Sequence, residues 1–184
     1  ALSFRYGNFL DAQRAHRWGV RGQQALRALC GQTLGIVGLG HTGVELVKRA
    51  KAFGMRVLAY RRSAQSPPEV DRLYSAERGE NLDELLEESD YVVLALPLSD
   101  QTYHLIGPKQ LARMRPTAHL VNIARGGLVD EPALITALRA GRLAGAAIDV
   151  AQEEPLPGDS PLWDTPNLLI TPHVTPQLED RDER

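Results

Sequence analysis

The sequence predicts an α/β fold in which a parallel sheet is doubly wound, with helices on both of its faces. Short, continuous apolar segments alternate with segments of helical periodicity over most of the 184 residues. Strands without polar alternation are typical of a parallel sheet that is buried on both faces. Because crossovers between parallel strands are right-handed, the connecting helices then pack on both sides of the sheet.

The bounds of the elements follow from apolar spacing and from residues that start or stop helices. Asn81 and Glu84 have the spacing of a capping box, and Asp130 is placed to cap a later helix. Pro67 and Pro68 favour a loop over 61–80. Strands are predicted over 33–38, 55–60, 91–96, 118–124, 144–150 and 167–171, and helices over 1–30, 41–53, 81–89, 108–114 and 130–141.

Composition excludes several classes of protein. The chain is 43% hydrophobic and 24% charged, with a net charge of −2, so no general attraction to nucleic acid or to an anionic membrane is expected. The apolar run over 91–98 is too short to span a bilayer. Cys30 is the single cysteine, which rules out an internal disulfide and a cysteine-based metal site. The N-terminus lacks the layout of a signal peptide, and we expect a cytoplasmic protein without a metal.

A glycine motif follows the first predicted strand. Gly38, Gly40 and Gly43 form a G-x-G-x-x-G frame in "GLGHTG", between a strand and a helix. In a Rossmann domain the first glycine allows a tight turn, the second lets the backbone approach a pyrophosphate, and the third brings the helix close to the sheet. The free amides of the helix N-terminus then face the phosphates. This context predicts dinucleotide binding.

Two arginines stand where the second predicted strand ends, about 20 residues past the glycines. An acid at this position meets the ribose 2′-hydroxyl of NAD, whereas Arg61 and Arg62 reverse the charge. A phosphate monoester carries about −1.5 to −2 charges, which a guanidinium can bind. The pair therefore favours NADP(H) over NAD(H), with a solvated basic loop as the alternative interpretation.

The ends of the later strands carry reactive side chains. Arg125 follows the strand over 118–124, Asp149 ends the strand over 144–150, and His173 follows the last strand, with Glu154 in a loop between them. Ligands of parallel sheets gather at such strand ends. An arginine can bind a carboxylate through its planar fork, and a histidine can exchange protons near neutral pH. Spacing alone leaves Arg125, Glu154 and His173 equally open to ordinary surface roles.

Several segments together resemble the D-isomer-specific 2-hydroxyacid dehydrogenases: "TLGIVGLGHTG", "NIARGGLVDE", "AAIDV", "EEPLP" and "SPLWDTPNLLITPH". The resemblance implies a catalytic set of Arg125, Glu154 and His173. In it the histidine protonates the keto oxygen, the glutamate holds the histidine and the arginine binds a small 2-oxo acid. It also implies that Asp149 contacts the nicotinamide carboxamide. The residues implied in cofactor binding, together with those of the two motifs above, are His41, Thr42, Leu96, Pro97, Ile123, Ala124, Arg125, Asp149 and His173.

The resemblance also implies a domain organisation. Members of the family are NAD(P)-dependent oxidoreductases with a second domain built from both chain ends, and from this resemblance we expect most of that substrate domain to lie outside this sequence. We therefore expect a helical linker or dimerisation segment over 1–30, a dinucleotide-binding domain over 31–173, and the start of a return segment over 174–184. The expected assembly is a homodimer. Arg61 favours the NADPH-using glyoxylate and hydroxypyruvate reductases. A dinucleotide-sensing scaffold like the C-terminal binding protein corepressors, and a structural dimerisation module, are the alternatives.

Overall fold

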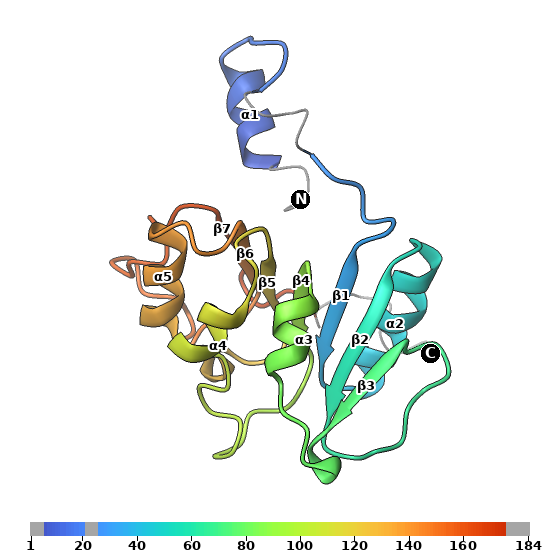
Figure 1. Cartoon of the computed structure of the whole chain (residues 1–184). Helices are drawn as coiled ribbons and strands as arrows, with labels where there is room; N and C mark the ends of the chain where they lie inside the picture. The colour runs from blue at the N-terminus through green and yellow to red at the C-terminus, as the bar shows by residue number, and fades with distance from the viewer. Residues whose placement is uncertain (1–5, 21–25, 176–184) are drawn as a thin grey trace, which may run out of the picture.

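The computed structural model describes residues 6–20 and 26–175. Its centre is a parallel sheet with the strand order β3-β2-β1-β4-β5-β6-β7 (Figure 1). The strands are β1 (Thr33–Val37), β2 (Arg56–Arg61), β3 (Arg72–Ser75), β4 (Tyr91–Leu94), β5 (His119–Asn122), β6 (Gly145–Ile148) and β7 (Leu168–Ile170). The order reverses direction between β1 and β4, which is the position of the ligand crevice in a doubly wound sheet. The predicted fold class is confirmed.

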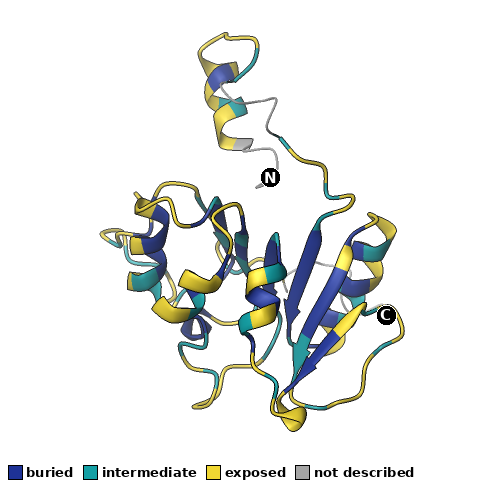
Figure 2. Cartoon of the chain, in the orientation of Figure 1, coloured by how far each residue is buried: buried dark blue, intermediate teal, exposed yellow. Residues whose placement is uncertain are grey.

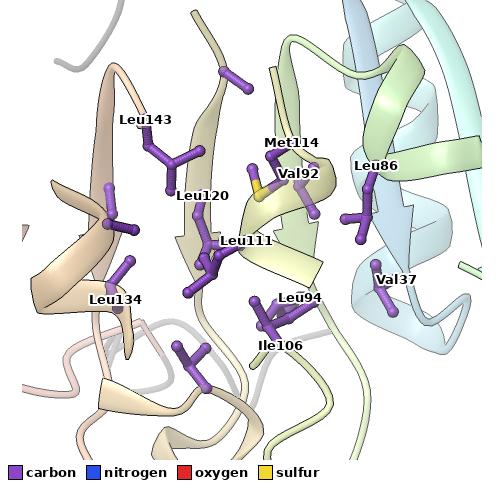
Figure 3. Close-up of a cluster of buried hydrophobic side chains, with 14 of the residues drawn as sticks. Val37, Leu86, Val92, Leu94, Ile106, Leu111, Met114, Leu120, Leu134 and Leu143 are labelled. Atoms are coloured by element: carbon purple, nitrogen blue, oxygen red, sulfur yellow. The ribbon is translucent and has the colours of Figure 1, made fainter. Parts of the chain in front are cut away.

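Successive residues of each strand point to opposite faces of the sheet, and helices cover both of these faces. The longer helices are α1 (Tyr6–Arg14), α2 (His41–Ala52), α3 (Asp83–Glu88), α4 (Pro108–Arg113) and α5 (Glu131–Arg139), with short 3-10 turns η2 (Ala76–Arg78) and η3 (Gly126–Leu128). In β1, Ile36 packs in the cluster that contains Val47 of α2, whereas Val37 packs in the cluster that contains α3, α4 and α5. Figure 3 shows this second cluster, in which Leu86, Leu111 and Leu134 come from the three helices. The strands are mostly buried and the outer helix faces exposed (Figure 2).

The prediction of a helix over 1–30 is wrong in its extent. Of residues 6–20 and 26–30, which the structure describes in this segment, Tyr6–Arg14 alone is helical, and residues 1–5 and 21–25 lie outside the described residues. His16 and Gly19 adopt positive φ angles of 51° and 96°, which a right-handed helix cannot continue. α1 consequently stands apart from the layers of the sheet (Figure 1).

The predicted loop over 61–80 contains a strand and a 3-10 turn. β3 extends the sheet at its edge, with Arg61 of β2 opposite Ser75. Its residues Leu73 and Tyr74 are buried in the clusters on opposite faces of the sheet. Two apolar positions between Arg72 and Ser75 give too short a pattern to predict a strand, so β3 and η2 were missed.

Helix α3 begins two residues after the predicted cap. Asn81 Oδ1 accepts a hydrogen bond from the backbone N–H of Asp83 at 2.9 Å, so Asn81 does bind a helix amide. Glu84 does not complete a capping box, because its carboxylate pairs with Arg72 at 2.6 Å. Asp130 caps α5 as predicted, since its side chain accepts from the backbone N–H of Ala133. The bounds of the other elements lie within roughly two residues of the prediction.

Candidate cofactor and catalytic site

The glycines of the motif make a narrow turn between β1 and α2. Gly38 has a φ of 103°, and a Cβ there would lie 2.5 Å from the carbonyl oxygen of Ala95. A Cβ on Gly43 would lie 2.2 Å from the carbonyl oxygen of Gly38, so α2 packs directly on the turn. A Cβ on Gly40, by contrast, would meet no protein atom within 4 Å. Gly38 and Gly43 therefore serve the packing of the turn, while Gly40 leaves open space beside it.

The open space at Gly40 adjoins the N-terminus of α2. Gly40 is the N-cap residue, and no side chain caps the helix there. His41 and Thr42 occupy the first positions of α2 and are exposed. An uncapped N-terminus leaves backbone N–H groups and the positive end of the helix dipole to an anion. The residues present thus fit a pyrophosphate, which is the group that a dinucleotide would place here.

Arg61 and Arg62 lie at the carboxyl end of β2, next to this turn. Tyr60 accepts a hydrogen bond from the backbone N–H of Gly38 at 2.8 Å, which joins the two strand ends. One guanidinium nitrogen of Arg61 donates to the carbonyl oxygen of Gln65 at 3.2 Å. Among the described residues, neither arginine forms a salt bridge with a carboxylate. Both charges therefore remain open to an anionic ligand.

The ends of β4 and β5 form the next part of the crevice. Leu96 and Pro97 follow β4, while Ile123 and Ala124 follow β5. The buried side chain of Asn122 fixes the turn after β5: its Oδ1 accepts from the N–H of Ala124 at 3.1 Å and its Nδ2 donates to the carbonyl of Arg125 at 2.8 Å. The Arg125 side chain is exposed, and one guanidinium nitrogen donates to the carbonyl oxygen of Ala124 at 2.6 Å. The sequence motif contained Asn122, but nothing in the pattern indicated its role.

Close backbone packing brings the end of β5 against the loop after β6. A Cβ on Gly126 would lie 1.9 Å from the carbonyl carbon of Ala151, so only glycine fits there. The loop is held further by Glu131, whose carboxylate accepts from the N–H of Gln152 at 2.7 Å. The side chain of Gln152 donates to the carbonyl of Val129 at 2.8 Å. These contacts, which the sequence did not reveal, fix the segment that carries Glu154.

His173 and Glu154 form a pair across this crevice. Nδ1 of His173 lies 2.7 Å from Oε2 of Glu154, and both side chains are partly exposed. The hydrogen bond with His173 lowers the pKa of Glu154, the N–H of Ala151 lowers it further, and the charge of Arg125 adds a smaller effect. Glu154 is therefore ionised at neutral pH and holds one ring nitrogen of His173.

Asp149 fixes the segment that carries His173. Its buried carboxylate accepts hydrogen bonds from the hydroxyl groups of Thr171 and Thr175 and from the N–H groups of Val174 and Thr175. Burial alone would raise the pKa of Asp149, but these hydrogen bonds outweigh it and lower the pKa to about 2. The carbonyl of Asp149 also accepts from the N–H of His173 at 2.7 Å. Asp149 thus holds the residues on both sides of the histidine.

The strand ends thus bring the four predicted reactive residues to one edge of the sheet. A cavity of about 640 Å³ opens there, and its lining includes Asp149, Glu154 and His173. Leu156, Trp163 and Ile170 supply apolar parts of its wall. Arg125 and the glycine turn are not part of this lining. They follow β5 and β1 at the same edge of the sheet.

Comparison with known proteins decides the family. The D-isomer specific 2-hydroxyacid dehydrogenase family, in its NAD binding domain, matches residues 1–175. The chain belongs to this family. The predicted resemblance is thereby confirmed, and the Rossmann sheet described above corresponds to the NAD binding domain of this family.

This domain is similar to two curated relatives and to one solved structure, described in turn below. A glyoxylate reductase from Thermococcus gammatolerans is 49% identical over 144 residues, which are 78% of this chain and 42% of that protein. A D-3-phosphoglycerate dehydrogenase from Methanocaldococcus jannaschii is 44% identical over 152 residues, 83% of this chain and 28% of that protein. The structure of an NADPH-dependent glyoxylate/hydroxypyruvate reductase from Sinorhizobium meliloti, in complex with NADP and sulfate, has a TM-score of 0.82 and 30% identity, over 94% of this chain and 54% of that one. The chain therefore spans less than half the length of these curated relatives.

No helix among the described residues is both long enough and apolar enough to cross a membrane.

Proposed function

We propose that this domain binds NADP(H), with NAD(H) as the weaker cofactor, and serves a full-length oxidoreductase that acts on a small 2-oxo or 2-hydroxy acid. Glyoxylate and hydroxypyruvate are the substrates we favour, because the similar proteins named above include reductases of these two acids. The 2.7 Å pair of His173 and Glu154 beside the Arg125 turn is the observation that carries the proposal.

The side chains have distinct parts in the proposed reaction. The dihydronicotinamide, when bound, supplies a hydride for the carbonyl carbon of the 2-oxo acid. Arg125 binds the carboxylate of the substrate through its planar guanidinium and so orients the carbonyl. His173, in its protonated form, donates a proton to the keto oxygen, and Glu154 stabilises the charged imidazole and fixes its orientation. We also propose that Asp149 contacts the carboxamide, in addition to the hydrogen bonds that hold the His173 segment.

An oxidation assay tests the proposal. NADPH and NADH are each incubated with the full-length protein and glyoxylate, hydroxypyruvate or pyruvate, and the loss of cofactor absorbance is followed. We expect turnover with glyoxylate or hydroxypyruvate and a higher kcat/KM with NADPH. The absence of turnover with all three acids, despite cofactor binding, would favour the corepressor-like scaffold, which draws no support from the similar proteins described above.

The proposed domain division keeps the dinucleotide-binding domain at 31–173, the N-terminal segment at 1–30 as a linker and dimerisation element, and 174–184 as the start of a return segment. A homodimer is the proposed assembly. Its support is the side chain of Trp18 in the N-terminal segment, which is fully exposed. Sedimentation of the full-length protein at micromolar concentration tests this assembly, and a purely monomeric protein would contradict it.

Gly40→Val is expected to weaken the binding of NADPH and NADH alike, on the order of tenfold. A side chain at Gly40 meets no protein atom, and the φ of −76° at Gly40 suits any residue, so the fold should tolerate the change. The branched side chain would instead occupy the space of the pyrophosphate. Fluorescence titration of both cofactors measures the effect. Gly7→Val in α1 is the control, because a Cβ on Gly7 is likewise free of contacts. Equal affinities in Gly40→Val and wild type would show that phosphates bind elsewhere.

A further inference from the structure

The segment that follows β2 is held in shape by the two elements that the sequence did not predict. The carbonyl oxygen of Arg62 accepts a hydrogen bond from the hydroxyl of Ser75 at 3.0 Å and another from the N–H of Glu77 at 3.0 Å. Ser75, the last residue of β3, is fully buried. These two bonds fix the direction of the peptide group that follows Arg62.

Glu77 also holds the other end of the same turn. Its Oε2 accepts a hydrogen bond from the backbone N–H of Ala64 at 3.0 Å. The backbone of Glu77 therefore binds Arg62 while its side chain binds Ala64, so one residue spans the segment over 62–64. Glu77 is exposed and contributes nothing to either hydrophobic cluster. Its visible contacts serve the shape of this turn and not the core.

Glu77 carries a negative charge next to the turn that contains Arg62. A carboxylate close to the proposed 2′-phosphate site repels the phosphate, which acts against NADP(H). A glutamate here therefore needs a compensating role, and the hydrogen bond to Ala64 supplies one. A fixed turn holds the arginine side chains where they meet the phosphate, so less conformational entropy is lost when the cofactor binds.

We propose that Glu77 is a positioning residue for cofactor selection: it fixes the 62–64 turn so that Arg61 and Arg62 receive the 2′-phosphate of NADP(H). The inference rests on the proposed preference for NADP(H). It adds the 62–64 turn, which positions the two arginines, to the features that determine this preference. NADH lacks the 2′-phosphate, so its binding does not depend on the turn in the same way.

Three variants of the full-length protein test the role of Glu77. Dissociation constants for NADPH and NADH are measured by fluorescence for wild type, Glu77→Ala, Glu77→Gln and Glu69→Ala. Glu77→Ala should weaken NADPH about two- to tenfold, the value of one net hydrogen bond, because the repulsion from an exposed carboxylate is screened and smaller, and should leave NADH within about twofold. Glu77→Gln keeps an acceptor for Ala64 and removes the repulsion, so its NADPH/NADH preference should equal or exceed that of wild type. Glu69→Ala removes the same charge from the loop over 62–71 without a contact to the 62–64 turn, and should leave the preference unchanged.

The outcomes separate this inference from the proposed function. A wild type that prefers NADH overturns the proposed cofactor preference and the role of Glu77 with it. A wild type that prefers NADPH, with a preference that Glu77→Ala leaves unmoved, overturns the role of Glu77 alone. An equal loss of NADPH and NADH in Glu77→Ala also overturns it, because a general loosening of the domain has no cofactor selectivity.

Discussion

His173→Ala in the full-length protein is expected to lower kcat about 10²- to 10⁴-fold and to leave the affinity for NADPH within a few-fold. The imidazole lies three residues after β7, with Nδ1 held by Glu154 at 2.7 Å, and is the group proposed to protonate the keto oxygen. The backbone contacts that place this segment come from Asp149 and do not need the imidazole. Steady-state kinetics with glyoxylate and a titration with NADPH measure the two effects separately.

A second variant separates chemistry from backbone strain. His173 has a φ of 52°, a conformation that alanine adopts less readily than asparagine. His173→Asn therefore keeps the turn at a lower cost while removing the proton donor, and should lose as much kcat as His173→Ala. His16→Ala, a matched change in the exposed N-terminal segment, should leave kcat unchanged. If both variants at 173 retain wild-type turnover, the proton donor must be another residue.

Glu154→Gln is expected to move the basic limb of the pH–rate profile for reduction to lower pH. The hydrogen bond with His173 lowers the pKa of Glu154, so the carboxylate is ionised across the neutral range and favours the protonated imidazole. Glutamine keeps the shape of the side chain and removes the charge. The imidazolium then lacks its charged partner, and reduction is expected to fall earlier as the pH rises. A profile of kcat/KM for wild type and variant over the neutral range measures this shift, and superimposable profiles would contradict the role of Glu154.

The glycine turn could be predicted from sequence because its geometry depends on local residue types. Gly38 has a positive φ, and Gly43 touches the backbone of Gly38, so both requirements lie within six residues. The cap of α5 by Asp130 was predictable for the same reason. The bounds of the buried strands followed from continuous apolar runs, which a sheet covered on both faces requires.

The contacts that orient the site could not be predicted, because they join distant parts of the chain. Asp149 binds Thr171 and Thr175, which lie 22 and 26 residues later, and no local pattern links a carboxylate to those hydroxyl groups. The pairing of His173 with Glu154 followed only from the family resemblance, since spacing left both residues open. β3 was hidden by its short apolar pattern, and with it the contacts of Glu77 to the 62–64 turn.

Arg61→Asp is expected to produce the largest change in cofactor preference. Arg61→Ala removes one charge-assisted hydrogen bond to the 2′-phosphate, about 1.5 to 3 kcal/mol, and should weaken NADPH about ten- to over a hundredfold. Partial exposure and salt screening place the effect at the lower end of this range. The aspartate adds repulsion of the phosphate and offers the ribose hydroxyl groups of NADH an acceptor, so the preference should invert.

The effect of ionic strength provides a second, independent readout of the same charges. The attraction between an exposed guanidinium and a phosphate weakens as salt shortens the Debye length, from about 10 Å at 0.1 M to 3 Å at 1 M. The advantage of NADPH in wild type should therefore shrink with rising salt, whereas the affinity for NADH should respond less. Dissociation constants for both cofactors at two ionic strengths, for wild type, Arg61→Ala and Arg61→Asp, measure both effects.

Arg139→Ala is the matched control for these changes. Arg139 ends α5, is exposed, and lies outside the glycine turn and the 62–64 turn, so its loss changes the net charge of the protein as much as Arg61→Ala does. A general electrostatic attraction of the protein for NADPH would weaken in both alanine variants. If Arg61 binds the 2′-phosphate directly, the affinity for NADPH weakens in Arg61→Ala and not in Arg139→Ala, because the phosphate then meets the protein at the end of β2. If Arg61→Asp leaves the NADPH/NADH ratio unmoved, Arg61 and Arg62 form a solvated loop, and the preference must arise elsewhere in the crevice.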